Sequence, residues 1–121
     1  MIVAVWTISG LLAAMYVSAG LGKVFGTRDK AIARTPYVED FTQSSIKLIG
    51  AVEVLGAIGL ILPTLTDIAP VLTPIAAAGL VLVQIGAIVV HVRRGELKVL
   101  PVNAVLLLAA AFVAVARFLG V

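Results

Sequence analysis

Four long blocks of this sequence are nearly free of charged residues, and they restrict the possible folds more than any other feature. Each block has roughly 17–25 residues, the length with which an α-helix crosses about 30 Å of hydrocarbon. Only 12% of all residues are charged, whereas a soluble domain carries about 25%. The sequence therefore predicts an all-α membrane protein, a single domain in which four transmembrane helices form an antiparallel bundle. The predicted spans are residues 2–22, 46–62, 71–92 and 101–120.

The first block has an alternative interpretation as a secretory signal peptide. Such peptides begin with a basic segment and have a shorter apolar core. The first lysine here, Lys23, follows the apolar run, which favours a helix that is retained. The sequence contains no cysteine, and this excludes disulfides, thiolate metal ligands and thiol–disulfide chemistry by the chain itself.

The basic residues predict how the chain is oriented in the membrane. Of the nine lysines and arginines, eight lie in or beside the first and third connections, and only Arg117 lies near the opposite end. Basic loops remain on the cytoplasmic side, so we expect both termini and the second connection on the outer side. The net charge of +3 comes with basic residues that lie in connections beside apolar spans, where they signal topology, so we expect no nucleic-acid partner.

Small residues predict which faces of the helices touch, because helices in lipid associate by close packing of their backbones. We expect these faces to bring the first three spans into close antiparallel contact. The small residues recur at regular steps: Gly10, Ala14, Ser18 and Gly22 in the first span, Gly50, Gly56 and Gly59 in the second, and Gly79 and Gly86 in the third.

Strongly polar residues are rare within the spans, and they are the candidate site residues. Ionisable groups at membrane depth cost at least about 2.5 kcal/mol each and usually face the bundle interior with a partner. We therefore expect them to form a polar network or a ligand-binding site. The candidates are Lys23, Glu53, Gln84, His91, Asn103 and Arg117.

The depths of these residues predict which of them meet. At 1.5 Å per residue, Glu53 lies roughly 10 Å and Gln84 roughly 12 Å from the cytoplasmic ends of their helices. His91 is seven residues from Gln84 and shares its helix face, while Lys23 and Asn103 lie at the same membrane side. We expect these five residues to converge in the inner half of the bundle, around Glu53 and His91.

Three candidates have a second interpretation. Lys23 is a flanking cation at the membrane surface, or its stem reaches back and stabilises the charged form of Glu53. His91 is an interfacial histidine beside a basic turn, or it belongs to the site. Arg117 lies fourteen residues beyond Asn103 in the fourth span, which is about 21 Å along the helix. It is therefore an interfacial anchor near the outer surface, or a site residue with Asp67 as a partner.

The residue types limit the chemistry. One histidine and one glutamate on different helices are too few for a usual metal site, which needs three or four protein ligands, so we expect no metal. No self-sufficient catalytic motif and no nucleotide-binding pattern is present. A glutamate and a histidine in a membrane suit proton exchange, or hydrogen bonding to a quinone or another lipid-soluble ligand.

Four segments in order resemble the DoxX-like family of small four-helix membrane proteins: SAGLGKVFG (18–26), IGAVEVLGAIGLILP (49–63), AAAGLVLVQIGAIVVHVRRGE (76–96) and VARFLG (115–120). The resemblance covers nearly the whole chain. It implies Lys23, Glu53, His91 and Arg117 as polar positions of the family type, so it includes the arginine that the depth estimate leaves out.

The resemblance implies several functions. Relatives are associated with thiosulfate:quinone oxidoreduction and with membrane-bound antioxidant assemblies, and animal relatives look like receptor-assembly chaperones. The leading hypothesis is an accessory or small-ligand-binding component of the bacterial inner membrane, with a quinone or a lipid as the candidate ligand. One alternative is the membrane subunit of a quinone-linked oxidoreductase, whose redox group would lie in a partner or a bound cofactor. The other is a transporter of a small solute or protons, which would need an oligomer. The candidate partners are a second copy or a larger membrane protein.

Overall fold

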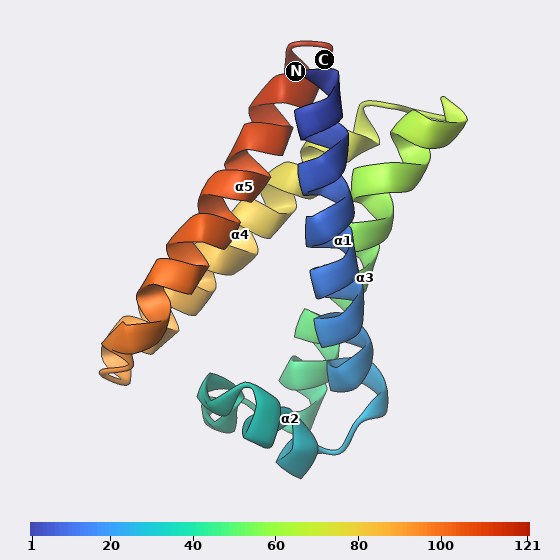
Figure 1. Cartoon of the computed structure of the whole chain (residues 1–121). Coiled ribbons are helices and arrows are strands. Elements are labelled where there is room, and N and C mark those ends of the chain that lie inside the picture. The colour runs from blue at the N-terminus through green and yellow to red at the C-terminus, as the bar shows by residue number, and fades with distance from the viewer.

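The computed structural model describes the backbone of residues 1–121 and every side chain except that of Tyr37. Over this described backbone the chain forms four long helices: α1 (Ile2–Phe25), α3 (Gln43–Thr66), α4 (Leu72–Arg93) and α5 (Leu100–Phe118). Short helices lie in two of the connections: α2 (Arg28–Arg34) and the 3₁₀ helix η1 (Pro36–Asp40) follow α1, and the 3₁₀ helix η2 (Leu97–Val99) precedes α5. Both termini lie at the same end of the bundle (Figure 1).

All four long helices are long and apolar enough to cross a membrane. The prediction of an all-α membrane protein with four antiparallel spanning helices is therefore confirmed. Helix α3 extends beyond the apolar span 46–62 at both ends and continues through Pro63 to Thr66. Proline in a helix removes a single backbone donor, and helices in membranes tolerate it because neighbouring groups satisfy the freed carbonyl.

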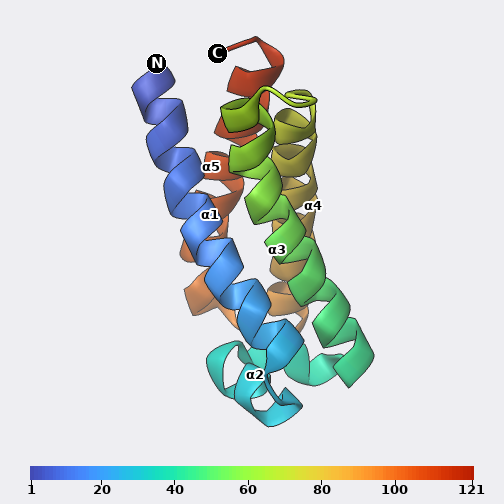
Figure 2. The ribbon, with the colours of Figure 1, turned by 90° about the vertical axis from the view of Figure 1, so that its right-hand side faces the viewer.

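The helices are arranged as two pairs. Helix α1 packs mainly on α3, and α4 mainly on α5, while α3–α4 and α1–α5 contacts join the pairs. The α4–α5 pair tilts away from the α1–α3 pair toward the end opposite the termini (Figure 1), and the turned view shows α2 at that same end (Figure 2). Buried side chains from all four helices fill the middle of the bundle, including Leu12, Leu60, Leu80 and Val113.

Two glycines allow the backbones of α1 and α3 to approach closely. A Cβ on Gly20 of α1 would lie 2.6 Å from the carbonyl oxygen of Gly50 in α3, and a Cβ on Gly50 would lie 2.7 Å from that of Gly20. Lys23 and Glu53 each lie three residues after one of these glycines. Side chains tilt toward the N-terminus of their helix, so in this antiparallel pair the two side chains point back toward each other across the glycine contact.

The predicted contact of the first three spans agrees with the packing of α1 on α3 and of α3 on α4, but only some of the small residues named for it make that contact. Gly50 packs on α1, and Gly56 and Gly59 face α4. By contrast, Gly10, Ala14 and Ser18 are exposed, and a Cβ added to Gly10, Gly79 or Gly86 would meet no described atom within 4 Å. The reason is that lipid-facing and helix-facing surfaces are both apolar in a membrane protein, so a stripe of small residues does not by itself identify the packed face.

The first connection folds into a compact cap segment, residues 28–40, comprising α2 and η1. Thr27 begins α2 by accepting a hydrogen bond from the backbone of Lys30, as expected of a threonine N-cap. Ala31 and Val38 of the cap segment pack on Ile46 of α3 and Ala87 of α4. The cap segment therefore bridges the two helix pairs where they diverge.

Candidate functional site

Buried polar side chains from all four long helices line one cavity of about 450 Å³ at the end of the bundle opposite the termini. Five of the six candidates predicted from the sequence are in its wall, each of them buried: Lys23, Glu53, Gln84, His91 and Asn103. Met15, Val83 and Leu106 add apolar surface to the same wall, and Arg34 and Thr35 of the cap region add polar surface. The cavity is thus polar on some sides and apolar on others.

Lys23 and Glu53 form an ion pair in this wall. Lys23 Nζ donates to Glu53 Oε1 at 2.7 Å, and the two side chains are 7% and 6% exposed. Lys23 is therefore paired with Glu53 and is not a free cation at the membrane surface. Removing two charges from water is expensive, and a buried pair balances that cost only while both partners are present.

Gln84 bonds to a residue that the sequence analysis missed. Its Nε2 donates to the hydroxyl oxygen of Tyr16 in α1 at 2.6 Å. The Oε1 atom of Gln84 is buried and has no hydrogen-bond partner among the described residues. Tyr16 lies seven residues before Lys23, and this spacing, which places it on the same helix face, was the available signal.

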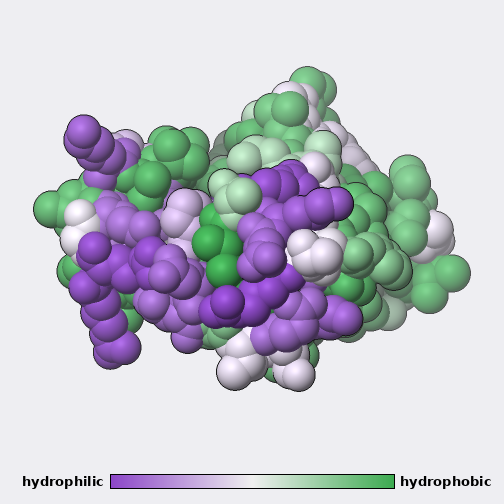
Figure 3. Space-filling model, turned by 90° about the horizontal axis from the view of Figure 1, so that it is seen from below, coloured by the Kyte–Doolittle hydropathy of each residue, from purple (hydrophilic) through white to green (hydrophobic). Residues whose placement is uncertain are grey.

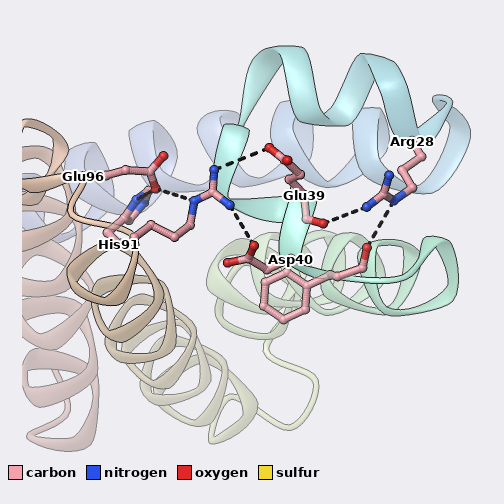
Figure 4. Close-up of polar contacts among 7 residues, drawn as sticks. Arg28, Glu39, Asp40, His91 and Glu96 are labelled. Atoms are coloured by element: carbon pink, nitrogen blue, oxygen red, sulfur yellow. Dashed lines mark hydrogen bonds and ion pairs between the residues drawn. The ribbon is translucent and has the colours of Figure 1, made fainter.

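His91 lines the cavity but bonds away from Glu53. Its Nδ1 lies 3.0 Å from Glu96 Oε1, and Arg94 Nε donates to the same oxygen at 3.1 Å (Figure 4). Burial alone would raise the pKa of Glu96, but the hydrogen bonds from His91 and Arg94 outweigh it and hold that pKa below its usual value. Glu53 and His91 therefore share a cavity while each is oriented by a partner of its own.

Arg94 ties the cap segment to the turn after α4. Its Nη1 donates to Asp40 Oδ1 at 2.8 Å, and its Nη2 lies 3.6 Å from Glu39 Oε2. Within the first connection, Arg28 donates to the backbone carbonyls of Glu39 and Phe41 at 2.7 and 3.2 Å (Figure 4). These bonds hold the cap segment against the cavity, whose wall includes its residues.

Replacing Arg94 by glutamine should loosen the cap segment. We expect faster amide hydrogen exchange over residues 28–40 and little change in overall stability, because partly exposed ion pairs contribute little. Hydrogen–deuterium exchange with mass spectrometry in nanodiscs measures this, with Arg93→Gln as the control because Arg93 is adjacent and exposed. Unchanged exchange in the cap segment would show that its apolar packing alone holds it.

Acidic pH should weaken the contacts by which Arg94 holds the cap segment. The pKa of Glu96 is lowered in the folded protein. Its charged form therefore stabilises the fold fully above the ordinary carboxyl pKa, and this stabilisation is lost as the pH falls through the lowered pKa. Protonation of Glu96 removes the negative charge that strengthens its bonds to His91 and Arg94, and with it part of what orients Arg94 toward the cap segment. The protection factors of the cap-segment amides, which compare each exchange rate with the intrinsic rate at the same pH, should therefore fall at acidic pH in the wild type, and fall less in Arg94→Gln.

Arg117 lies at the other end of the molecule. Its guanidinium carbon stands 4.6 Å from the centre of the Trp6 ring, and its Nη1 donates to the carbonyl of Val121 at 2.7 Å. Arg117 and Trp6 line a separate cavity of about 480 Å³. Its side-chain hydrogen bond and ring contact are with these two residues and not with Asp67, so the structure does not bring Arg117 to the other five candidates.

Arg34 is a second residue of the cavity wall that the sequence analysis missed. It lies in the cap segment, and the sequence carries no signal for it, because the position of a connecting segment depends on how that segment folds back on the bundle.

Comparison with known proteins identifies the family. A model of the DoxX-like family matches residues 7–113. No curated protein and no solved structure matches the chain. The matched range includes the five candidates that line the cavity and excludes Arg117.

Proposed function

The chain belongs to the DoxX-like family, and from this premise we propose that it is an accessory component of the bacterial inner membrane that binds one small lipid-soluble ligand around Glu53 and His91. One observation carries the proposal: five buried polar side chains surround a cavity of about 450 Å³. Cavities of roughly 300–1,000 Å³ with a few convergent polar groups in apolar walls are typical of small-molecule sites.

The walls suit a ligand with a hydrogen-bonding head and an apolar body. Lys23 carries three N–H donors, of which one is directed at Glu53, and the Asn103 amide supplies both donors and an acceptor. Met15, Val83 and Leu106 offer apolar surface. A quinone and a single-chain lipid both have this combination of polar head and apolar body.

The charge distribution supports an orientation with the cavity in the cytoplasmic half of the membrane. Seen from the end opposite the termini, hydrophilic residues extend from one side of the molecule across its centre, and apolar residues lie mainly along the top and the other side (Figure 3). This end carries the first and third connections, which hold most of the basic residues. Basic loops remain in the cytoplasm, so both termini would lie on the outer side.

The filled centre of the bundle favours binding over passage through a single copy. Leu12, Leu60, Leu80 and Val113 belong to one buried core. Along α1, the core residue Leu12 lies between Trp6, which lines the cavity of Arg117, and Lys23, which lines the cavity of Glu53. A ligand in the first cavity therefore meets packed side chains, as expected of a binding site.

The proposal predicts a bound molecule that depends on the polar wall. We expect the protein purified in mild detergent to carry one small molecule in native mass spectrometry. Asn103→Leu should lower its occupancy roughly tenfold, because an unsatisfied buried hydrogen-bonding group costs about 1–3 kcal/mol. Ser9→Ala is the matched control, since Ser9 is a buried polar residue of α1 outside the cavity wall.

The identity of the bound molecule separates the hypotheses. Quinone absorbance that is lost in Asn103→Leu would favour the membrane subunit of a quinone-linked oxidoreductase. A lipid or fatty acid would favour the accessory, ligand-binding role. Folded protein that carries no small molecule, and binds none when quinones and lipids are added, would overturn the proposal.

A further inference from the structure

A second, smaller pocket adjoins the main cavity beneath α1. It has a volume of about 120 Å³, and its wall consists of Ala19, Gly22, Lys23, Ala31, Arg34 and Thr35. Ala19, Lys23, Arg34 and Thr35 also belong to the wall of the main cavity. The two spaces therefore share Lys23 and Arg34 as wall residues, and we call the smaller one the head pocket.

The head pocket carries a positive charge that no described carboxylate balances. The charge of Lys23 is paired with Glu53, but Arg34 has no ion-pair partner among the described side chains. The Arg34 guanidinium lies over Gly22, since a Cβ added there would stand 2.6 Å from its Nη1. The lysine is buried and fixed by its bond, whereas the arginine lies at the exposed edge of the cap segment.

This arrangement matches the chemistry of an anionic oxygen group. A guanidinium presents a planar fork of donors that suits carboxylate or phosphate oxygens, and charge-assisted hydrogen bonds are roughly twice as strong as neutral ones. Lys23 retains N–H donors beyond the one that Glu53 accepts. The Thr35 side chain is the further polar group in the wall. An anion held here would neutralise the uncompensated charge of Arg34.

We propose that the head pocket binds the carboxylate or phosphate group of a single-chain amphiphile, whose apolar chain lies in the main cavity against Met15, Val83 and Leu106. The inference rests on the proposed function of the cavity and adds the charge and shape of its ligand. The main cavity, at about 450 Å³, is near the lower end of small-molecule sites, which favours one chain over the two chains of a bilayer phospholipid.

Four probes with matched structures test the proposal on the full chain in phosphatidylcholine nanodiscs. Hexadecanoate and hexadecyl phosphate carry the anionic group, hexadecanol has the same chain without the charge, and inorganic phosphate has the charge without the chain. We expect both anionic amphiphiles to bind at least tenfold more tightly than hexadecanol, and inorganic phosphate to show no binding. Tight binding of inorganic phosphate alone would assign the head pocket to a free anion and overturn the proposal.

Two variants change Arg34 and leave the buried ion pair of Lys23 with Glu53 in place. Arg34→Gln removes the charge, and Gly22→Ala introduces a Cβ that displaces the flexible guanidinium. Each should lower the affinity for hexadecanoate roughly tenfold, as expected for one lost charge-assisted hydrogen bond, and leave the affinity for hexadecanol unchanged. Lys30→Gln removes an equal charge from an exposed residue of α2 outside both pockets, and it should change neither affinity.

The outcomes separate this inference from the proposed function. If hexadecanol binds as tightly as hexadecanoate, or Arg34→Gln leaves hexadecanoate binding unchanged, the anionic head group is refuted while ligand binding in the main cavity stands. If Leu106→Trp, which adds bulk to the wall of the main cavity only, leaves every affinity unchanged, the main cavity does not hold the chain and both proposals fail.

Discussion

Replacing Lys23 by methionine should destabilise the protein by about 3–5 kcal/mol, the usual cost of removing one partner from a buried ion pair. The side chains of Lys23 and Glu53 are almost completely buried, and their bond is 2.7 Å long. In the variant the Glu53 carboxylate would remain buried without its counter-charge. Unfolding titrations with denaturing detergent in mixed micelles measure the free energy of unfolding and its change.

The double variant Lys23→Met with Glu53→Gln separates charge from packing. It removes both charges and keeps side chains of similar size, so most of the lost stability should return. Lys47→Met serves as the control, since Lys47 is an exposed lysine of α3 near the same end, and we expect it to be nearly neutral. If the double variant is as unstable as Lys23→Met, the loss comes from packing and the unpaired charge is not its cause.

Replacing Gly20 or Gly50 by alanine should cost about 1–3 kcal/mol or more, the range for overpacking a tight interface. The added Cβ would stand 2.6 Å from the Gly50 carbonyl in the first case and 2.7 Å from the Gly20 carbonyl in the second. Because these neighbours are backbone atoms, α1 and α3 have to separate. That separation would also lengthen the bond between Lys23 and Glu53, so ligand occupancy should fall together with stability.

Alanine at three other glycines provides the matched control. Gly10, Gly79 and Gly86 are helical, and an added Cβ would meet no described atom within 4 Å at any of them. There we expect no loss, and up to about 1 kcal/mol of gain, because alanine loses less conformational freedom in a helix than glycine. A large loss at Gly10 or Gly86 would show that these exposed faces contact another protein, such as a second copy.

The sequence predicts well those properties that depend only on position along a helix axis. A helix rises by a constant amount per residue, so length and apolarity predict spanning helices, and counting from the span ends predicts depth. Glu53 and Gln84 were estimated at similar depths, and in the structure both line one cavity. The same count separated Arg117 from the others, and it lies at the opposite end beside Trp6.

The rotation of each helix about its own axis, which decides which face packs on the other helices, is harder to predict from the sequence. In a soluble helix the apolar side faces the core, but these helices are apolar on every side, and lipid-facing positions such as Leu11 and Leu48 resemble buried ones. The stripe from Gly10 to Ser18 was therefore assigned to the wrong face. The spacing of seven residues between Tyr16 and Lys23 does not by itself assign Tyr16 to the site, because tyrosines near the ends of spanning helices are also enriched as interfacial anchors.

The sequence by itself determined that this chain forms four helices long and apolar enough to span a membrane, that the basic residues gather at one end, and at what height along the bundle each polar residue lies. These properties are local, since they follow from composition and the helical rise. Only the tertiary structure decided that Lys23 bonds to Glu53 while His91 bonds to Glu96, and that the cap segment brings Arg34 to the cavity. These pairings depend on the rotation and tilt of whole helices, which the backbone contact of Gly20 with Gly50 and the packing of Ala31 and Val38 establish.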